Sequence, residues 1–295
     1  MLDPLLVRIE KLHAAGRKAL AVLPLSKDQD YFDELADLLR AHILGKQGDL
    51  FAEHLEGILA SVDDGLSMAA TLRALEEDLG ERLSEITRDR VERLLTRAYS
   101  RGQIDIRRTS RWDFSQTDER IAGWLARDTG YWVGAHWGDS VTTAVQGTLA
   151  EHRGESRVKI VEALQEELSG MVRRSNGYWS NMANHVTTRA RSFGITEGLV
   201  QIGAKVGIFD AVLDSRTSDV CRHMDGKKIL VSDMVELRDR LVDAQDPEAV
   251  RTLQDWTKLN PDQITQDTVD GRPPIYASLP PLHFGCRSHI IFVDG

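Results

Sequence analysis

The sequence predicts a mainly α-helical protein with a small α+β domain, containing a short β-sheet, at its C-terminus. Over most of the first 200 residues, apolar side chains recur at the three- and four-residue spacing of one helix face. After Gly203, short runs rich in β-branched and aromatic residues replace that spacing, as is typical of strands. The 295 residues are 41% hydrophobic and 28% charged, the balance of a globular chain that buries a core.

Residues 1–101 are predicted to form a helical N-terminal region. Asp3 followed by Pro4 marks the start of a first helix. Ser26 begins a capping box for the next one, and Gly45 is the predicted stop of that helix. Periodicity then predicts three further helices, over Leu50–Ala60, Met68–Leu79 and Arg82–Arg101.

The polar and basic segment 102–116 is the predicted linker to a second domain, residues 117–295. This domain divides into helices over 117–202 and an α+β part over 203–295. Its predicted elements follow in chain order: strands at Lys205–Leu213 and Lys228–Val231, helices near Asp233–Asp243 and Pro247–Leu259, a proline-rich loop over Asn260–Phe284, and a strand at Ser288–Val293.

Composition excludes several classes of protein. With 46 acidic against 37 basic residues, the net charge of -9 argues against a protein that coats nucleic acid over its whole surface. Two cysteines cannot form a disulfide scaffold in a chain of this size. Since no apolar run approaches a membrane span and residues 1–12 make a poor signal peptide, we expect a soluble protein made in the cytoplasm, without a membrane partner.

Common catalytic motifs are missing from the sequence. It contains no Gly-rich phosphate loop, no Gly-x-Ser-x-Gly elbow and no His-Glu-x-x-His. We therefore expect no enzymatic activity.

Both cysteines lie in short segments that also carry histidines. Cys221 precedes His223 by two residues, and His283 precedes Cys286 by three, with His289 close behind. Thiolate and imidazole on two distant loops are typical of a structural zinc site, so Cys221, His283 and Cys286 are candidate ligands of one structural Zn²⁺, with His223 or His289 as the fourth. The alternative is that both cysteines are reduced, buried and structural, because the spacing matches no standard zinc finger.

The segment from Asp214 to Asp225 predicts a turn and a short helix. Thr217 or Ser218 is a candidate N-cap, and Asp225-Gly226 is a hairpin-turn dipeptide that would lead into the strand at Lys228. The carboxylates could bind a cation, but Asp is common at turns for local hydrogen-bonding reasons, so we take the turn as the default interpretation.

Four arginines share one face of the predicted helix Arg82–Arg101, because they are three or four residues apart: Arg90, Arg93, Arg97 and Arg101. This arginine stripe could contact the phosphates of double-stranded DNA. Interleaved acidic residues also permit an exposed helix with intrahelical ion pairs, which is the default interpretation of a charged run.

In combination, these motifs resemble the phage Mu F-like head-morphogenesis domain of tailed-phage minor head proteins. The resemblance spans roughly Gly130–Val293 and rests on a strand followed by Asp-x-Arg-Thr-Ser-x-x-Cys, then Asp-Gly, then Pro-Pro-x-His-x-x-Cys-Arg. The residues that match the family's motif, besides the metal-ligand candidates, are Asp214, Arg216, Thr217, Ser218, Asp225, Gly226, Pro281 and Arg287. Phe284 and Ser288 stand where the family often has Pro and a further Cys, so His223 or His289 would have to complete the ligand set.

This resemblance implies a structural minor head protein of a tailed phage or prophage. Such a protein associates with the portal and with capsid or scaffold proteins, in the host cytoplasm during assembly and then inside the virion. Its surfaces would do the binding, with Trp124, Trp132 and Trp179 as packing anchors and packaged double-stranded DNA as a further partner of the arginine stripe.

Two alternatives stay open on the sequence. One is a zinc-stabilised nucleic-acid-binding module built on the Cys and His segments. The other is a toxin-related effector in which a Mu F-like domain follows a helical effector region, although that region lacks the clustered polar residues of an active site.

Overall fold

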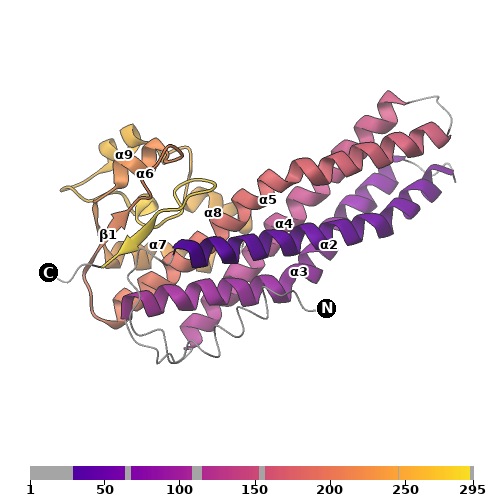
Figure 1. Cartoon of the computed structure of the whole chain (residues 1–295). Coiled ribbons are helices and arrows are strands. Elements are labelled where there is room, and N and C mark those ends of the chain that lie inside the picture. Colours follow the sequence, from indigo (N-terminus) through magenta and orange to yellow (C-terminus); the bar gives the residue numbers. More distant parts are fainter. Residues whose placement is uncertain (1–28, 64–67, 108–114, 153–156, 245, 293–295) are drawn as a thin grey trace.

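A computed structural model of the chain describes residues 29–63, 68–107, 115–152, 157–244 and 246–292 (Figure 1). Four long helices, α2 (Gln29–Asp63), α3 (Met68–Arg107), α4 (Gln116–Glu151) and α5 (Arg157–Gln201), extend along the molecule. A smaller unit with a three-stranded sheet lies at one end of them. The predicted fold class, mainly α with a small α+β C-terminal part, is confirmed.

The helices are longer and fewer than periodicity predicted. α2 continues through Gly45, so the predicted stop there is wrong, and one helix covers Leu50–Ala60 as well. α3 likewise joins the two helices predicted over Met68–Leu79 and Arg82–Arg101. Packing against neighbouring helices outweighs the cost of an interior glycine. The signals at Asp3-Pro4 and Ser26 lie outside the described residues.

The expected linker 102–116 begins inside a helix. α3 runs to Arg107, and Gly102 is buried where α3 meets α5: a Cβ atom on it would lie 2.4 Å from the carbonyl oxygen of Arg191. Buried residues before and after this segment belong to one hydrophobic core. Gly102 therefore marks a close contact between two helices.

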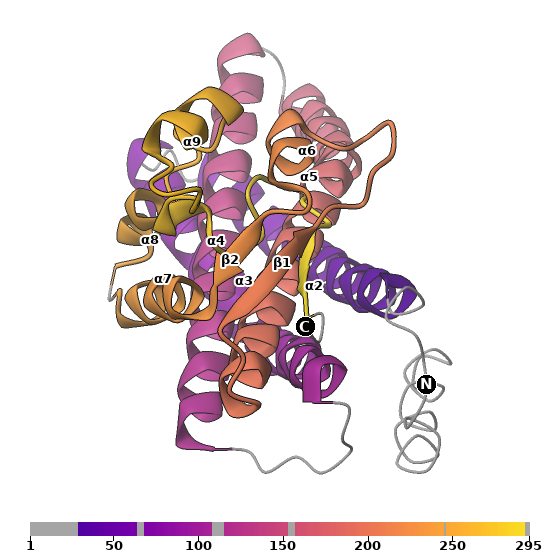
Figure 2. The same cartoon turned by 90° about the vertical axis from the view of Figure 1, so that its left-hand side faces the viewer.

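Three short antiparallel strands form the sheet in the order β2-β1-β3 (Figure 2). Central β1 (Val206–Asp210) pairs with β2 (Lys228–Leu230), and its other edge pairs with β3 (His289–Ile291) in a register that sets Asp210 opposite His289. All three strands lie within the predicted ranges. The sheet thereby joins residues near 208 to the last described residues.

The remaining elements cover the sheet and its surroundings: α6 (Asp219–Met224), α7 (Val231–Asp243), α8 (Pro247–Leu253), α9 (Pro261–Asp267) and the 3₁₀ helix η2 (Ile275–Ala277). The predicted proline-rich loop thus contains two helical segments. Gln254 holds the C-terminal part of this loop in place, because its side-chain amide donates to the carbonyl oxygens of Leu279 and Pro281 at 2.9 and 3.1 Å.

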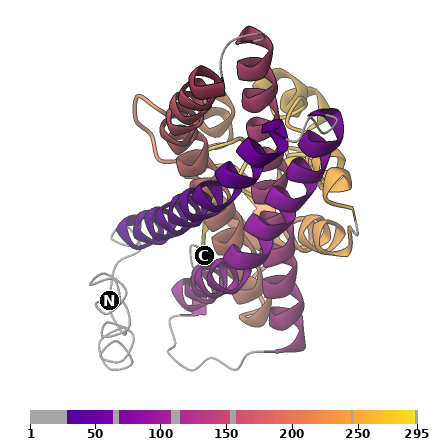
Figure 3. The same ribbon diagram turned by 90° about the vertical axis from the view of Figure 1, so that its right-hand side faces the viewer.

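Figure 3 shows the long helices from the end opposite the sheet, with the α+β unit behind them. A buried ion pair between Glu197 of α5 and Arg238 of α7, 3.0 Å long, connects the two parts. Among the helices that the structure describes, none has the length and apolar character required to cross a bilayer.

Candidate metal centre

Cys221 is positioned by the short helix α6. The Ser218 side chain caps this helix by accepting a hydrogen bond from the Cys221 backbone N–H at 3.3 Å, which confirms Ser218 as the N-cap. The cap places Cys221 in the first turn, where its side chain is 2% exposed. A polar turn residue therefore fixes the direction of a buried thiol.

His283 and Cys286 sit on a tight turn in the loop before β3. The Cys286 N–H donates to the His283 carbonyl oxygen at 3.2 Å, closing the turn. Gly285 has φ +77°, in the left-handed region that favours glycine. This turn brings the His283 ring and the Cys286 thiol to the same side, facing Cys221.

The three side chains form one compact cluster. Cys221 Sγ lies 3.2 Å from His283 Nε2 and 3.6 Å from Cys286 Sγ, and all three ligand atoms lie within 4.8 Å of one another. Both cysteines are free thiols, since 3.6 Å is far beyond the roughly 2.05 Å of a disulfide. These three residues lie close enough together to bind a metal ion.

The dimensions of the cluster suit a tetrahedral ion. Zn²⁺ with bonds of about 2.3 Å to sulfur and about 2.0 Å to nitrogen sets its sulfur ligands roughly 3.8 Å apart and a sulfur and a nitrogen roughly 3.5 Å apart. The observed separations of 3.6 and 3.2 Å lie a few tenths of an ångström inside those edges. These two separations are therefore compatible with zinc, and the third, between His283 and Cys286, is within 4.8 Å.

A hydrogen bond sets the tautomer of His283. Its Nδ1 lies 2.9 Å from the Phe284 carbonyl oxygen, so Nδ1 carries the proton and donates it there. The lone pair of Nε2 then points at the two sulfur atoms. This arrangement is usual for a metal-binding histidine, whose second nitrogen donates to a carbonyl or carboxylate.

The two thiols share a proton. The hydrogen bond from Cys221 lowers the pKa of Cys286 to about 6, and N–H groups of Leu282 and Ser288 strengthen the effect. The same bond, followed by burial, raises the pKa of Cys221 to about 12. The pair therefore loses its first proton below the usual pKa of a thiol, and a thiolate is the form that binds metal.

An ion pair joins the two motif segments beside the cluster. One Arg287 nitrogen lies 2.8 Å from both carboxylate oxygens of Asp214. This contact with Arg287 lowers the pKa of Asp214. The Thr188 hydroxyl of α5 also donates to the Cys286 carbonyl oxygen at 2.9 Å, which attaches the second segment to the long helix.

The two histidines expected as a fourth ligand lie elsewhere. His223 Nε2 is 3.4 Å from the Thr265 hydroxyl of α9, and His289 Nε2 is 3.2 Å from Asp210 Oδ2 across the β1–β3 pair. Neither belongs to the cluster, so both predictions of a fourth ligand are wrong. His223 follows Cys221 by two residues, and on a helix such residues do not face each other.

The other motif residues form turns and local contacts. Asp225 accepts the Ala211 N–H at 2.9 Å, and Gly226, at φ +73°, leads from α6 into β2 as predicted. Thr217 donates to the Val212 carbonyl oxygen at 2.6 Å, whereas the Arg216 side chain is exposed and 3.7 Å from Asp214. Buried Pro281 offers its carbonyl oxygen to Gln254.

The arginine stripe follows the contact of α3 with α2. Arg101 pairs with Asp105 at 2.9 Å and lies over the Tyr31 ring, 5.6 Å from its centre. Arg90 and Arg97 are half-buried, and Arg93 is exposed. Arg101 therefore has a structural role, and Arg93 is the member of the stripe that faces solvent.

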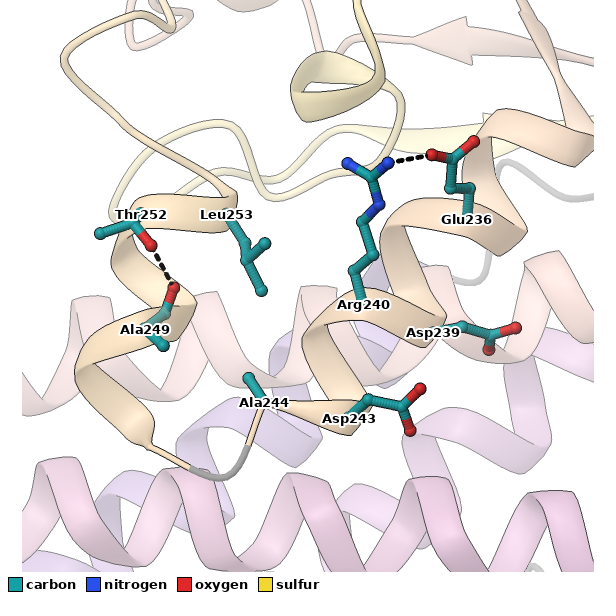
Figure 4. A pocket seen from close by; sticks show the side chains of 8 residues that line it. All are labelled: Glu236, Asp239, Arg240, Asp243, Ala244, Ala249, Thr252 and Leu253. Atoms are coloured by element: carbon teal, nitrogen blue, oxygen red, sulfur yellow. Dashed lines mark hydrogen bonds and ion pairs between the residues drawn. The ribbon is translucent and has the colours of Figure 1, made fainter.

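The cavity between α7 and α8 is lined by charged residues that pair within the fold (Figure 4). Arg240 pairs with Glu236, and Asp239 and Asp243 point away from the space between the helices. Both aspartates lie near Arg120 of α4, at 3.7 and 3.0 Å. This cavity therefore has no charged group directed at a ligand.

Comparison with known proteins adds no relative: no protein family, no curated protein and no solved structure matches this chain. The resemblance to the Mu F-like domain therefore rests on the sequence motifs alone.

Sequence reasoning missed several residues that shape this region. Gly285 makes the turn between two ligands, and its position inside His-x-x-Cys could have indicated that role. Buried Asp128, His185 and Arg189 are dispersed over two helices and carry no local signal. Trp256, a ring that is 44% exposed, follows α8 and was not recognised as part of any site.

Proposed function

We propose that this chain is a structural head-assembly protein of a tailed phage or prophage, whose C-terminal domain is clamped by one Zn²⁺ held by Cys221, His283 and Cys286. The observation that carries the proposal is the meeting of two motif segments, 65 residues apart at their cysteines, with the sulfur atoms at 3.6 Å.

The motif residues support a structural role. Ser218 caps a helix, Asp214 pairs with Arg287, and Gly226 makes a turn. Each of these contacts stabilises the shape of the unit that surrounds the cysteines. If the segments around Cys221 and Cys286 had lain far apart in the structure, the motif residues would not support one structural unit.

The zinc would act as a cross-link. Closing a loop of this length restricts the unfolded chain, and metal binding adds to folding free energy because the ligands are dispersed when unfolded. Three protein ligands leave the fourth position of a tetrahedral zinc ion open to a further ligand. The clamp would hold α6 and the end of the chain against α5, giving portal, capsid or scaffold proteins a rigid surface to bind.

Metal analysis of purified variants tests the clamp. The wild-type protein should contain about one zinc per chain, as expected for a single site. His283→Ala should lose it, and His223→Ala, a histidine on the same unit that faces α9, should retain it. Equal metal content in the two variants, or no metal in the wild type, would contradict the clamp.

Analysis of phage particles tests the assembly role. In particles produced by the bacterium that carries this gene, mass spectrometry of purified heads should detect the chain together with the portal protein. Deletion of the gene should reduce the yield of filled heads. Complete heads that lack the chain would refute the assembly role and leave the metal site unaffected.

DNA contact would rest on Arg93, the exposed member of the arginine stripe. Arg93→Ala should reduce the slope of log affinity against log salt concentration by about the amount that one phosphate contact contributes. An unchanged slope would exclude this contact.

A further inference from the structure

A cavity of about 500 Å³ lies between α4, α5 and the residues that follow α8. Aromatic side chains from four parts of the chain line it, together with a buried ion pair: Trp132 of α4, Tyr178 of α5, Trp256 after α8, and Phe284 of the loop before β3. A volume of this size is typical of sites that bind small molecules or the anchoring side chains of a partner.

Two buried polar atoms at this cavity have no hydrogen-bond partner among the residues that the structure describes. They are Nδ1 of His185 and Nε of Arg189, on side chains of residues that are each 5% exposed. These residues are four apart on α5, so they share one helix face. Leaving a buried polar atom unpaired is unfavourable, and a bound group with matching atoms would remove that cost.

The two atoms differ in what they require. His185 forms a hydrogen bond with the backbone of His283, so the ring donates there and its Nδ1 is left as an acceptor; burial lowers the pKa of His185, which keeps the ring neutral. Arg189 donates from its other two nitrogens to Asp128 and Gln254, both at 3.3 Å, and its Nε is a further donor. A hydroxyl group both donates and accepts, so it supplies the two kinds of partner that these atoms require.

The rings favour an aromatic occupant. Phe284 lies between Tyr178, at 5.5 Å, and Trp256, at 6.1 Å between ring centres. Trp256 also lies 5.1 Å from the His185 ring and leaves 44% of its surface exposed. An aromatic ring placed against Trp256 would cover this apolar surface in the offset or edge-on geometry that such rings prefer.

The charges around the cavity favour a neutral occupant. Arg189 is balanced by Asp128, and Arg251 pairs with Glu248 at 3.1 Å while lying over the Trp132 ring. A cation would meet two arginines and find the face of Trp132 already covered. The phosphate of a nucleotide would meet the carboxylates of Asp128 and Asp255, which line the cavity.

We propose that this cavity binds a tyrosine side chain of a partner protein, whose hydroxyl donates to His185 Nδ1 and accepts from Arg189 Nε while its ring packs against Trp256 and Phe284. The cavity exceeds the volume of one such ring, so adjacent residues of the partner segment also enter it. The inference rests on the proposed function in one respect: it assumes that the binding partner is another protein.

Binding of small probes to the intact, full-length chain tests the site. We expect N-acetyl-tyrosinamide to bind saturably, with a dissociation constant on the order of 1 mM for a ligand of this size. N-acetyl-phenylalaninamide, which lacks the hydroxyl, should bind at least about tenfold more weakly. Chemical-shift changes of the Trp256 indole N–H in NMR spectra report the binding.

Two further probes separate the alternatives. Adenosine binding more tightly than N-acetyl-tyrosinamide would overturn the proposal in favour of a nucleobase, and tighter binding of N-acetyl-argininamide would overturn it in favour of a cation. Absence of saturable binding by N-acetyl-tyrosinamide would also refute it, and would leave an ordered water as the partner of the two buried atoms.

Variants provide the controls. Trp256→Ala should weaken N-acetyl-tyrosinamide binding at least about tenfold, because it removes one wall of the cavity. Val269→Ala, which shortens an apolar side chain that is 67% exposed and does not line the cavity, should bind like the wild type. His185→Phe should abolish the preference for the tyrosine probe over the phenylalanine probe, and a preserved preference would refute the role of Nδ1.

Metal content keeps the two proposals separate. Trp256→Ala should keep the zinc content of the wild type, so a loss of probe binding in this variant does not reflect loss of the clamp. Failure of every probe in a protein that contains zinc would refute the cavity proposal alone.

Discussion

Gly285 makes the tight turn that brings His283 and Cys286 together. Its φ of +77° lies in the left-handed region, and a Cβ atom there would lie 3.1 Å from the Asn181 side-chain oxygen. Any L-residue at this position would strain the backbone between two ligands of the candidate metal site.

Gly285→Ala should therefore destabilise the protein by about 1–2 kcal/mol, the cost of a left-handed conformation for a residue with a Cβ. It should also weaken metal binding, because the turn sets the separation of the ligands. Urea unfolding and metal titration measure the two effects. Gly147→Ala is the matched control: Gly147 is exposed in the interior of α4 with open space around it, and alanine should stabilise it by about 0.5–1 kcal/mol. If both variants lose equal stability, strain at Gly285 is not the cause.

His289 is a buried histidine that stays neutral. Its 3.2 Å distance to Asp210 would suit an ion pair, but burial, aided by the positive charge of Arg191, lowers the pKa of His289 to about 3. The ring therefore donates an N–H to the carboxylate as a neutral group. The unfolded chain takes up a proton near pH 6.5, the ordinary pKa of histidine, and the folded chain does not.

Because the folded pKa is lowered, the stability that His289 provides is complete above about pH 6.5 and is lost as the pH falls toward 3. The free energy of unfolding should decrease by up to about 1.4 kcal/mol per pH unit from this residue. Urea unfolding at pH 7.0 and 5.5 measures the decrease, and His289→Gln should reduce it. Burial raises the pKa of Asp210, which opposes the trend at lower pH. An unchanged pH dependence in His289→Gln would contradict this assignment.

At the scale of elements, α5 is the central support of the molecule. It packs against α2, α3 and α4 along its length and against α7 and β3 near its C-terminal end. The Thr188 hydroxyl of α5 donates a hydrogen bond to the Cys286 carbonyl oxygen, and Glu197 of α5 forms an ion pair with Arg238 of α7. The helix thereby connects the bundle to the unit that carries the candidate metal site.

Breaking the Glu197–Arg238 pair from one side should be costly. Arg238 is buried and its side chain is 6% exposed, so Glu197→Leu leaves its charge with only the partly exposed Asp239 beside it, at 3.0 Å, and should destabilise the protein by about 1–3 kcal/mol. The double variant Glu197→Leu/Arg238→Met should recover most of this loss, since an apolar pair needs no charge compensation. Chemical unfolding of the wild type, Glu197→Leu, Arg238→Met and the double variant measures the coupling energy between the two side chains. Additive losses would show that the two side chains act independently.

The elements also show where pattern reasoning succeeds. The three strands were predictable because β-branched runs are short and local, and α6, the Asp225-Gly226 turn and the Ser218 cap follow from residues that are neighbours in sequence. The stop at Gly45 was wrong because the end of a helix depends on packing along its whole length. Nothing near Gly45 in sequence reports the contacts of α2 with α3 and α5.

At the scale of the whole molecule, the candidate metal site lies in the unit at one end of the bundle, while most of the large core lies between the long helices. The bundle has buried residues of its own, including Leu95, Tyr99 and Val133. Loss of metal should therefore affect one part of the molecule more than the other.

Chelation of zinc should raise amide hydrogen exchange in residues 214–225 and 282–289 and leave α3 and α4 protected. The reason is that the proposed clamp would join two segments that also share the Asp214–Arg287 ion pair, and Thr188 holds the second of them to α5. Exchange measured by mass spectrometry before and after a chelator separates these regions. Uniform loss of protection would show that the metal supports the whole fold, and no change would show that it supports none.

The sequence by itself determined which residue types are available and where local structure begins: the amphipathic helices, the short strands, the cap at Ser218, and two segments that each pair a cysteine with a histidine. Those features depend on neighbours along the chain. Only the tertiary structure decided that His283 joins the cysteines and that His223 and His289 do not, and that His185, Arg189 and Trp256 share a cavity. The physical reason is that the metal ligands come together only when the residues between Cys221 and His283 fold back on themselves. The direction in which each side chain points also depends on how its helix or strand is packed.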